Sequence, residues 1–364
     1  MTVEPFVAPE PAHRQVPALG TQPLPAGPLD WVARLPSASA PGFVYLAGAC
    51  RDVSVGGGGR DLAEAEARLA GEAAEVLAQT AAPVATDAPG LPALDAAWTT
   101  AQRPLRIAAT DASSGAAVGV PAAAVFLGAA AAERRPDAPP ASLGLAAGRD
   151  PNAARLAALL ELVERDAAAR WWCEGVPPRQ LDAAALAGAA ADLARMRAEA
   201  AVPRAVAFLS LASPTGVPVA CAFSRDRDGR GLALGLKAAP WPAAAAAGAL
   251  VELMQMELAL EMARHRSGRG AAAPADAGPL ARAALRPEEF PAFAALPPEP
   301  AAPVPADFAG LAARLAGQGF PVVFADLPPA GGLAVAKIFV PGLLPLPGGG
   351  PARHGTPGAA TPLM

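Results

Sequence analysis

The chain has little of what nucleic-acid-binding, secreted and membrane-spanning proteins need. Only two lysines occur, Lys237 and Lys337, and a formal net charge of −4 gives no sign of a nucleic-acid partner. Three cysteines, scattered and odd in number, exclude a disulfide framework and zinc-ligand spacing. The N-terminus shows no signal peptide, and no uninterrupted apolar stretch reaches the length of a membrane span. We therefore expect a cytoplasmic protein without a membrane partner. The excess of alanine and arginine over lysine suggests a GC-rich bacterial genome.

The chain also lacks a recognisable nucleophilic triad. Two of its histidines fall in Pro-rich segments and the third ends an Arg-rich helix, so no Ser-His-Asp or Cys-His constellation can be assembled. Each cysteine is expected to be a small buried hydrophobe, and no catalytic residue is assigned. These residues are His13, His354 and His265, and Cys50, Cys173 and Cys221.

The most informative feature present is an acidic pair on an apolar helix predicted over 151–173. Asp150 is a good N-cap, and Pro151 suits the first helical position. Glu161 and Glu164 are three residues apart and therefore share a face of the helix. One interpretation is a solvated face with an ordinary salt bridge. The other is a metal ion with a phosphate ligand, since acids beside apolar residues need a cation.

Two further predicted helices repeat this arrangement. The helix over 61–80 carries Glu72 and Glu75, and we expect the glycine run at 56–59 to be a flexible loop leading into it. The helix over 242–264 carries Glu252 and Gln255, again three apart. Oxygen ligands of this kind suit magnesium, which favours carboxylates together with substrate phosphates.

These three helices together resemble the YcaO superfamily, whose members bind Mg-ATP with glutamates on paired helices and lack a P-loop. The resemblance covers roughly residues 42 to 350. Its matching text comprises Gly71-Glu72-Ala-Ala-Glu75, Ser142-Leu-Gly-Leu-Ala-Ala-Gly148, Leu159-Leu-Glu161-Leu-Val-Glu164-Arg165-Asp166-Ala167, Ala249-Leu-Val-Glu252-Leu-Met-Gln255-Met-Glu257, Asp326-Leu327 and Lys337-Ile-Phe-Val-Pro341-Gly342-Leu343.

The resemblance implies ATP and Mg²⁺ as cofactors and assigns roles to named residues. Glu72, Glu75, Glu161 and Glu164 would ligate magnesium or position the nucleotide phosphates. Arg165 would contact phosphate through its planar donor fork, although a structural pair with Asp166 or Glu161 is the alternative. Glu252 and Gln255 would lie in the same cleft.

Several positions depart from the family pattern. Gly58 stands where a lysine is usual, Arg68 replaces a small residue, Val76 replaces an arginine and Ala153 replaces a glutamate. The expected Asp-Leu-Thr-Arg reads Asp326-Leu327-Pro328-Pro329, and Lys337 replaces an arginine. At least one expected metal ligand is missing. Either fewer ligands suffice, or nucleotide binding is weak or lost.

The alternation of strand-like and helical segments predicts an α/β fold. By resemblance it is YcaO-like, with mixed sheets, packed helices and an internally duplicated arrangement of Glu-bearing helices. We expect a Pro-rich N-terminal segment over 1–40, an ATP-binding domain over 41–348 and a Pro/Gly-rich tail over 349–364. The predicted strands are 43–46, 205–211, 217–223, 231–236, 321–325 and 334–340, and the remaining predicted helices are 120–133, 182–199 and 307–318.

As the family implies, the expected function is ATP-dependent activation of a backbone amide in a ribosomally made peptide, with cyclodehydration of Cys, Ser or Thr to an azoline. The alternatives are a degenerate non-catalytic scaffold of such a complex, and a thioamide-forming or methylthiolation accessory factor. The expected partners are the precursor peptide and a protein that captures its leader, because only about 40 Pro-rich residues precede the first predicted strand. A homodimer is left open. In peptide-cyclising members a proline-rich C-terminus reaches the active site, and the spaced prolines from Pro341 onward are partly similar.

Overall fold

Three separate β-sheets, each with its own helices, make up the part of the chain that the structure describes. The computed structural model describes residues 29–299 and 303–344, and every pair between its named strands is antiparallel. In strand order the sheets are β1 (Trp31–Leu35), β2 (Val44–Cys50) and β3 (Val53–Gly59); β10 (Ala233–Ala238), β9 (Val219–Arg225), β8 (Ala205–Leu211) and β7 (Arg179–Gln180); and β5 (Ala117–Pro121), β4 (Arg106–Asp111), β11 (Val323–Ala330), β12 (Leu333–Phe339) and β6 (Leu145–Gly148).

The helices begin where the sequence supplies a cap. Four of them start after an aspartate whose side chain accepts a hydrogen bond from a backbone N–H of the first turn, which satisfies a donor that has no partner inside the helix: Asp61, Asp150, Asp182 and Asp307. The helices are α1 (Leu62–Gln79), α2 (Pro92–Trp98), α3 (Pro151–Cys173), α4 (Ala183–Met196), α5 (Pro242–Gly268), α6 (Ala277–Ala283) and α7 (Phe308–Gly317), with short 3₁₀ helices at Ala122–Ala124, Ala129–Glu133, Pro274–Asp276, Pro287–Glu289 and Pro291–Phe293.

Glycines let two helices pack directly against the backbone of their strands. A Cβ at Gly57 of β3 would lie 2.2 Å from the carbonyl oxygen of Ala65 in α1. A Cβ at Gly235 of β10 would likewise lie 2.2 Å from the carbonyl oxygen of Ala249 in α5. No side chain fits at either position. Helices α1 and α5 are therefore held unusually close to their sheets.

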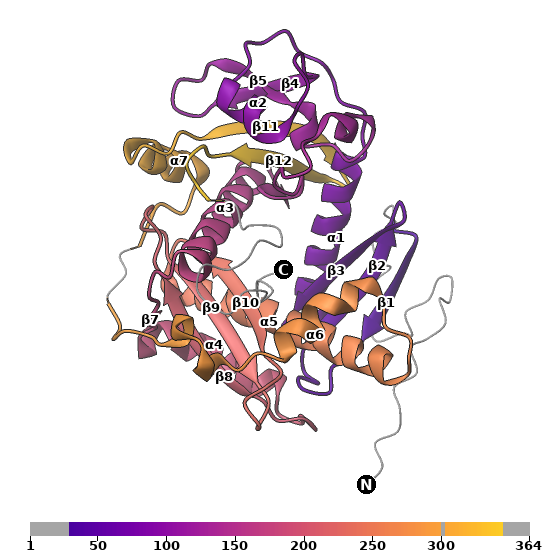
Figure 1. Ribbon diagram of the computed structural model, residues 1–364, viewed down its shortest axis with the longest axis vertical. Coiled ribbons are helices and arrows are strands. Elements are labelled where there is room, and N and C mark those ends of the chain that lie inside the picture. The colour runs from indigo at the N-terminus through magenta and orange to yellow at the C-terminus, as the bar shows by residue number, and fades with distance from the viewer. Residues whose placement is uncertain (1–28, 300–302, 345–364) are drawn as a thin grey trace.

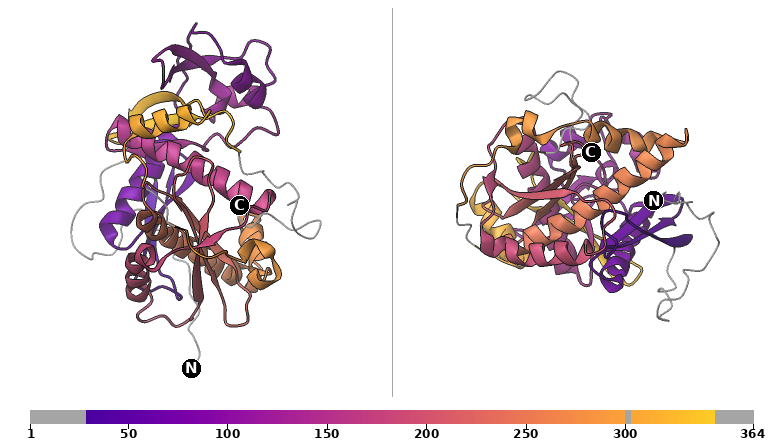
Figure 2. Two further views of the ribbon diagram at one scale, coloured as in Figure 1. Left: turned by 90° about the vertical axis from the view of Figure 1, so that its left-hand side faces the viewer. Right: turned by 90° about the horizontal axis from the view of Figure 1, so that it is seen from below.

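The five-stranded sheet combines segments from both halves of the chain. Strands β11 and β12, near the end of the chain, lie between β4 and β6. This sheet and α7 form one end of the molecule, and the four-stranded sheet lies toward the other (Figures 1 and 2). Helix α3 contacts β6 and β12 of the first and β10 of the second. It therefore bridges the two sheets.

The C-terminal half of α3 is the centre of the largest hydrophobic core. Trp171 and Trp172 are each 1% exposed and pack edge-on against each other, 5.7 Å apart between ring centroids. Phe293, from the segment after α6, contacts both rings. This aromatic anchor fixes the position of α3, because burying two tryptophans contributes a large apolar area.

Helix α5 is long and apolar enough to cross a bilayer by length and composition, with a mean hydropathy of 1.4 in its most apolar window. However, 56% of that window is buried inside the protein, and the helix packs on β10, β9 and α4. Core helices of this length meet the same criterion. We interpret α5 as such a core helix.

The α/β fold with several sheets and packed helices is confirmed, and three boundaries differ from prediction. The run 120–133 is not one helix: it holds the end of β5 and two 3₁₀ helices, because Pro121 and Gly128 interrupt it. The glycine run at 56–59 belongs to strand β3 and not to a loop. Strand β1 pairs with β2 inside the segment expected to be extended, so the domain includes residues before 41. The predicted 349–364 tail and the prolines from 345 onward lie outside the described residues.

Candidate functional site

Helix α1 carries two carboxylates, and each is held by a backbone N–H of a different sheet. Glu72 Oε2 accepts a hydrogen bond from the N–H of Gly56 on β3 at 2.6 Å. Glu75 Oε1 accepts one from the N–H of Ala147 on β6 at 2.9 Å. The three-residue spacing therefore places both acids on one face, as predicted, with one oxygen of each fixed.

Helix α3 presents its acidic pair in the same way. Glu161 Oε2 accepts from the N–H of Gly144 at 3.1 Å, and Glu164 Oε2 accepts from the N–H of Ala238 at the end of β10 at 3.2 Å. The Glu164 side chain is 3% exposed and that of Glu161 is 27% exposed. The interpretation of this pair as a solvated acidic face is therefore wrong for Glu164.

Helix α5 completes the set with one carboxylate and one amide. Glu252 Oε2 accepts from the N–H of Leu236 on β10 at 3.2 Å. The amide of Gln255 lies against β3, since a Cβ at Gly58 would be 2.6 Å from Gln255 Nε2 and 2.5 Å from Phe43 Cζ. Gln255 and Phe43 therefore occupy the space beside the position where the sequence comparison expected a lysine.

Two cations lie among these acids. Arg165 Nη2 is 3.5 Å from Glu164 Oε1, and Arg165 Nε is 3.9 Å from Glu161 Oε1. Lys237 on β10 places its Nζ 3.9 Å from Glu164 Oε2. Of the two alternative structural pairs of Arg165, the one with Glu161 is present, and the one with Asp166 is not formed, because Asp166 binds Arg170 at 2.8 Å. The guanidinium of Arg165 therefore faces the carboxylates.

The acids interact across the three helices. Burial, together with the smaller effect of the charges of Glu161 and Glu72, raises the pKa of Glu75 to about 8. Burial followed by the charge of Glu164 likewise raises the pKa of Glu252. Burial also raises the pKa of Glu161, and desolvation by the surrounding protein raises that of Glu72, although its surface is exposed. Buried acids with raised pKa values are typical of functional sites.

The arrangement fits a hydrated Mg²⁺ with phosphate ligands better than a closed protein cage. In the described residues no group of three or more acidic, histidine or cysteine side chains is close enough to hold a metal ion. Five carboxylates form a row in the sense that each successive pair repels, from Glu72 through Glu75, Glu161 and Glu164 to Glu252, and this repulsion favours a cation. Magnesium usually takes one or two carboxylates and completes its shell with water and phosphate oxygens. The row Glu72, Glu75, Glu161, Glu164 and Glu252 supplies such ligands.

Other departures from the family pattern have structural partners. Arg68 forms a salt bridge of 2.9 Å with Glu64 of its own helix, and Val76 is buried in the core beneath α1. Asp326 pairs with Arg155, whose Nε lies 2.8 Å from the carboxylate. Pro328 and Pro329 coincide with a register shift between β11 and β12.

Lys337 holds the loop that precedes β6 in place. Its ammonium is fully buried and donates hydrogen bonds to the carbonyl oxygens of Ala141, at 2.8 Å, and Leu143. Burial lowers its pKa to about 7. Gly144, which follows Leu143 in the chain, donates its N–H hydrogen bond to Glu161. Lys337 therefore fixes the loop that orients a carboxylate of the row.

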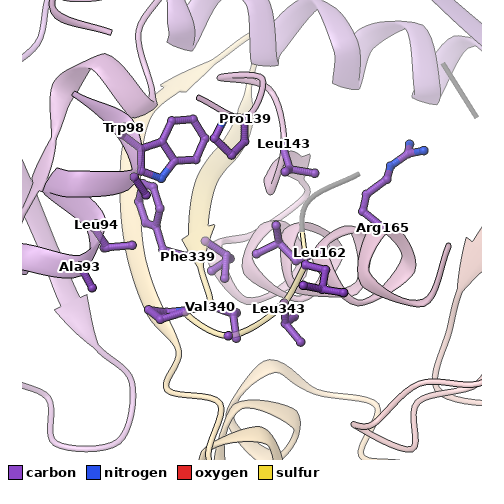
Figure 3. Close-up of a pocket in the computed structure, with 15 residues that line it drawn as sticks. Ala93, Leu94, Trp98, Pro139, Leu143, Leu162, Arg165, Phe339, Val340 and Leu343 are labelled. Carbon is purple, nitrogen blue, oxygen red and sulfur yellow. The ribbon is translucent and has the colours of Figure 1, made fainter. Parts of the chain in front are cut away.

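An apolar pocket of about 300 Å³ opens beside Arg165. Figure 3 shows Trp98, Leu162, Phe339 and Leu343 lining it, while the Arg165 side chain extends away from these apolar residues. The pocket and the carboxylate row therefore meet at Arg165. Cys50 and Cys221 are buried away from solvent, and burial raises the pKa of both thiols, so neither is poised as a nucleophile.

Comparison with known proteins identifies the class. The model of the YcaO cyclodehydratase family, described as binding ATP and Mg²⁺, matches residues 62–344. The chain therefore belongs to the YcaO family, and ATP and Mg²⁺ are the cofactors of that family. A search of curated proteins finds no significant match.

Solved structures agree on the fold. A heterocyclase in complex with substrate and cofactor superposes with a TM-score of 0.69 at 18% identity, covering 87% of this chain and 50% of that one. YcaO from Methanopyrus kandleri, bound with AMPPCP and Mg²⁺, gives 0.62 at 22% identity and 85% coverage of both chains. The E. coli microcin synthetase McbBCD complex with pro-MccB17 bound gives 0.64 at 14% identity, covering 88% of this chain and 90% of that one. The chain thus spans half the length of the heterocyclase.

Proposed function

We propose that this chain uses ATP and Mg²⁺ to activate a backbone amide of a ribosomally made peptide, cyclising a Cys, Ser or Thr residue to an azoline. The observation that carries the proposal is the row of five carboxylates from α1, α3 and α5, with Arg165 among them. Membership of a family of ATP-binding cyclodehydratases supports the same reaction class.

The reaction's difficulty is the amide oxygen, which is a poor leaving group. Bound ATP would supply the phosphoryl group that makes this oxygen leave as phosphate once the neighbouring thiol or hydroxyl has added to the carbonyl carbon. One or two carboxylates of Glu72, Glu75, Glu161 and Glu164 would hold a magnesium ion that keeps water and phosphate oxygens as its other ligands. Arg165, whose pKa is raised overall because the adjacent carboxylates outweigh burial, stays cationic and would contact phosphate oxygens.

The substrate side of the proposal rests on the pocket beside Arg165. Its volume of about 300 Å³ and its apolar lining suit a side chain of the peptide next to the reacting residue. We further propose a separate protein that captures the precursor's leader. The likeness to the synthetase structure with pro-MccB17 bound supports a peptide and partner proteins.

Equilibrium binding tests the nucleotide step. We expect the wild-type chain to bind ATP only with Mg²⁺, and Glu161→Gln or Glu164→Gln to abolish most of that binding. Glu289→Gln is the matched control, because its side chain is 64% exposed and pairs with Arg286 on the surface. Absence of binding by a folded wild type at millimolar ATP would refute the proposal.

A scaffold without catalysis is the second candidate, and the surroundings of Gly58 favour it. Phe43 and Gln255 fill the space beside this glycine, and Ala153 brings no carboxylate. If the chain is a scaffold, it should increase modification of a precursor by a partner enzyme while its own Glu161→Gln variant does so equally well. Mass spectrometry of the precursor, which loses one water for each azoline, separates the two functions.

A further inference from the structure

One of the two lysines in the chain lies inside the carboxylate row. Lys237 extends from β10, and its side chain is 43% exposed, whereas Lys337 is fully buried. The residues on either side of it anchor two of the acids: the N–H of Leu236 binds Glu252, and the N–H of Ala238 binds Glu164. Lys237 therefore stands between carboxylates of α5 and α3.

The fold makes room for this side chain. Gly248 lies inside α5 where the helix passes Lys237, and a Cβ there would lie 2.5 Å from Lys237 Cγ. Glycine is unfavourable in the interior of a helix, so the position indicates a packing requirement. The aliphatic part of Lys237 lies in the groove that Gly248 leaves.

The ammonium acts on more than its nearest neighbour. It lies 3.9 Å from Glu164 Oε2, beyond hydrogen-bond distance. Its charge lowers the pKa of both Glu75 on α1 and Glu252 on α5, against the larger effect of burial. The charged groups that face it are thus Glu75, Glu164 and Glu252. The ammonium lies near all three acid-bearing helices and is not committed to one partner.

We propose that Lys237 binds the terminal phosphates of the nucleotide, supplying a second cation from β10 in addition to the guanidinium of Arg165. This assignment rests on the proposed function, because it needs a nucleotide in the cleft. A lysine suits the role, since its ammonium has three donors on a flexible stem and binds phosphate as a point charge. The other interpretation, a plain counter-ion for Glu164, predicts no preference among nucleotides.

Titration calorimetry with the full chain separates these interpretations. Lys237→Met should weaken binding of Mg-ATP by about tenfold, the expected loss for a charge-assisted hydrogen bond. Its affinity for AMP should stay within about twofold of wild type, and Lys237→Arg should keep ATP affinity within about threefold. Arg195→Met is the control, because Arg195 is 60% exposed on α4 and pairs with Asp192 at 2.8 Å. Thermal unfolding without ligand establishes that each variant is folded, and Lys237→Gln serves as a second neutral variant.

The outcomes are distinct. An equal loss of ATP and AMP affinity in Lys237→Met would show that the lysine only positions the carboxylates, and unchanged ATP affinity would show that it contacts no phosphate. A tenfold loss in Arg195→Met would attribute the effect to overall charge. Each of these results overturns the assignment while wild-type Mg-ATP binding, and with it the proposed function, stands. A wild-type chain that binds no nucleotide overturns both.

Discussion

The contribution of Glu75 to the stability of the ligand-free protein should fall as pH rises, because the folded state holds a proton on Glu75 that the unfolded chain has lost. The ordinary pKa of a glutamate is 4.5, and burial raises that of Glu75 to about 8. Below pH 4.5 both states are protonated and the full stability is present. Between pH 4.5 and 8 stability declines, and above pH 8 this group has no further effect.

The magnitude follows from the shift. One pKa unit corresponds to about 1.4 kcal/mol, so Glu75 should account for a loss of about 2 kcal/mol between pH 6 and pH 8. Lys337 acts in the opposite direction: burial lowers its pKa to about 7, so its contribution grows as pH rises above 7. The effect of Glu75 must therefore be taken as a difference between the wild type and Glu75→Gln.

Urea denaturation at pH 6, 7 and 8 without magnesium or nucleotide measures that difference. Glu75→Gln keeps an acceptor for the N–H of Ala147 and removes the titration. The free energy of unfolding of this variant, relative to that of the wild type, should therefore increase by about 2 kcal/mol from pH 6 to pH 8. Glu289→Gln, on the surface, should follow the wild type. A wild type and Glu75→Gln with parallel pH profiles would show that Glu75 is not desolvated as described.

Four further substitutions test the packing around the site. Gly57→Ala should lower the free energy of unfolding by about 3 kcal/mol, because its Cβ would meet the backbone of α1. Gly71→Ala should raise the free energy of unfolding by about 1 kcal/mol, since its Cβ would meet only the Cβ of Ala147, at 4.0 Å. Equal urea midpoints for Gly57→Ala and Gly71→Ala would contradict the close packing of α1. Lys337→Met should lower the melting temperature and weaken Mg-ATP binding, because the carbonyls left unpaired lower the free energy of unfolding by about 1–3 kcal/mol. Unchanged calorimetric affinity for Mg-ATP would show that Lys337 does not support the site. Asp326→Asn should change stability by less than about 1 kcal/mol and leave ATP affinity as in wild type, because Asp326 pairs with Arg155 at the surface. A loss of ATP affinity in that variant would place Asp326 in the cleft.

The acid-bearing helices could be predicted because their signals are local. Helical spacing of apolar residues and an aspartate or proline at the start define α1, α3 and α5. The spacing of Glu161 and Glu164 likewise predicts a shared face. The α1, α3 and α5 pairs then come together as the resemblance implied, although their coordination of one ion remains a prediction.

What local patterns could not show is contact between distant segments. The glycines at 56–59 looked like a loop because glycine is a poor strand former. They form a strand because α1 packs too closely on β3 for any side chain at Gly57. The alanine run at 122–124 looked helical, yet it is fully buried in a 3₁₀ turn after β5. Lys237 was missed as a site residue because Glu164 is far from it in sequence, and the rarity of lysine was its only signal.

The position of β12 has a consequence for the order in which the site can form. Strand β6 supplies Ala147, which anchors Glu75, and among the named strands it pairs only with β12. During synthesis β6 therefore waits, without its neighbour, for almost two hundred further residues. Glu75, made early, cannot acquire its anchor until one of the last described strands has emerged. The acidic cleft is thus assembled only after translation of nearly the whole described chain. Ligand binding therefore indicates that the hairpin of β11 and β12 has taken its place in the sheet.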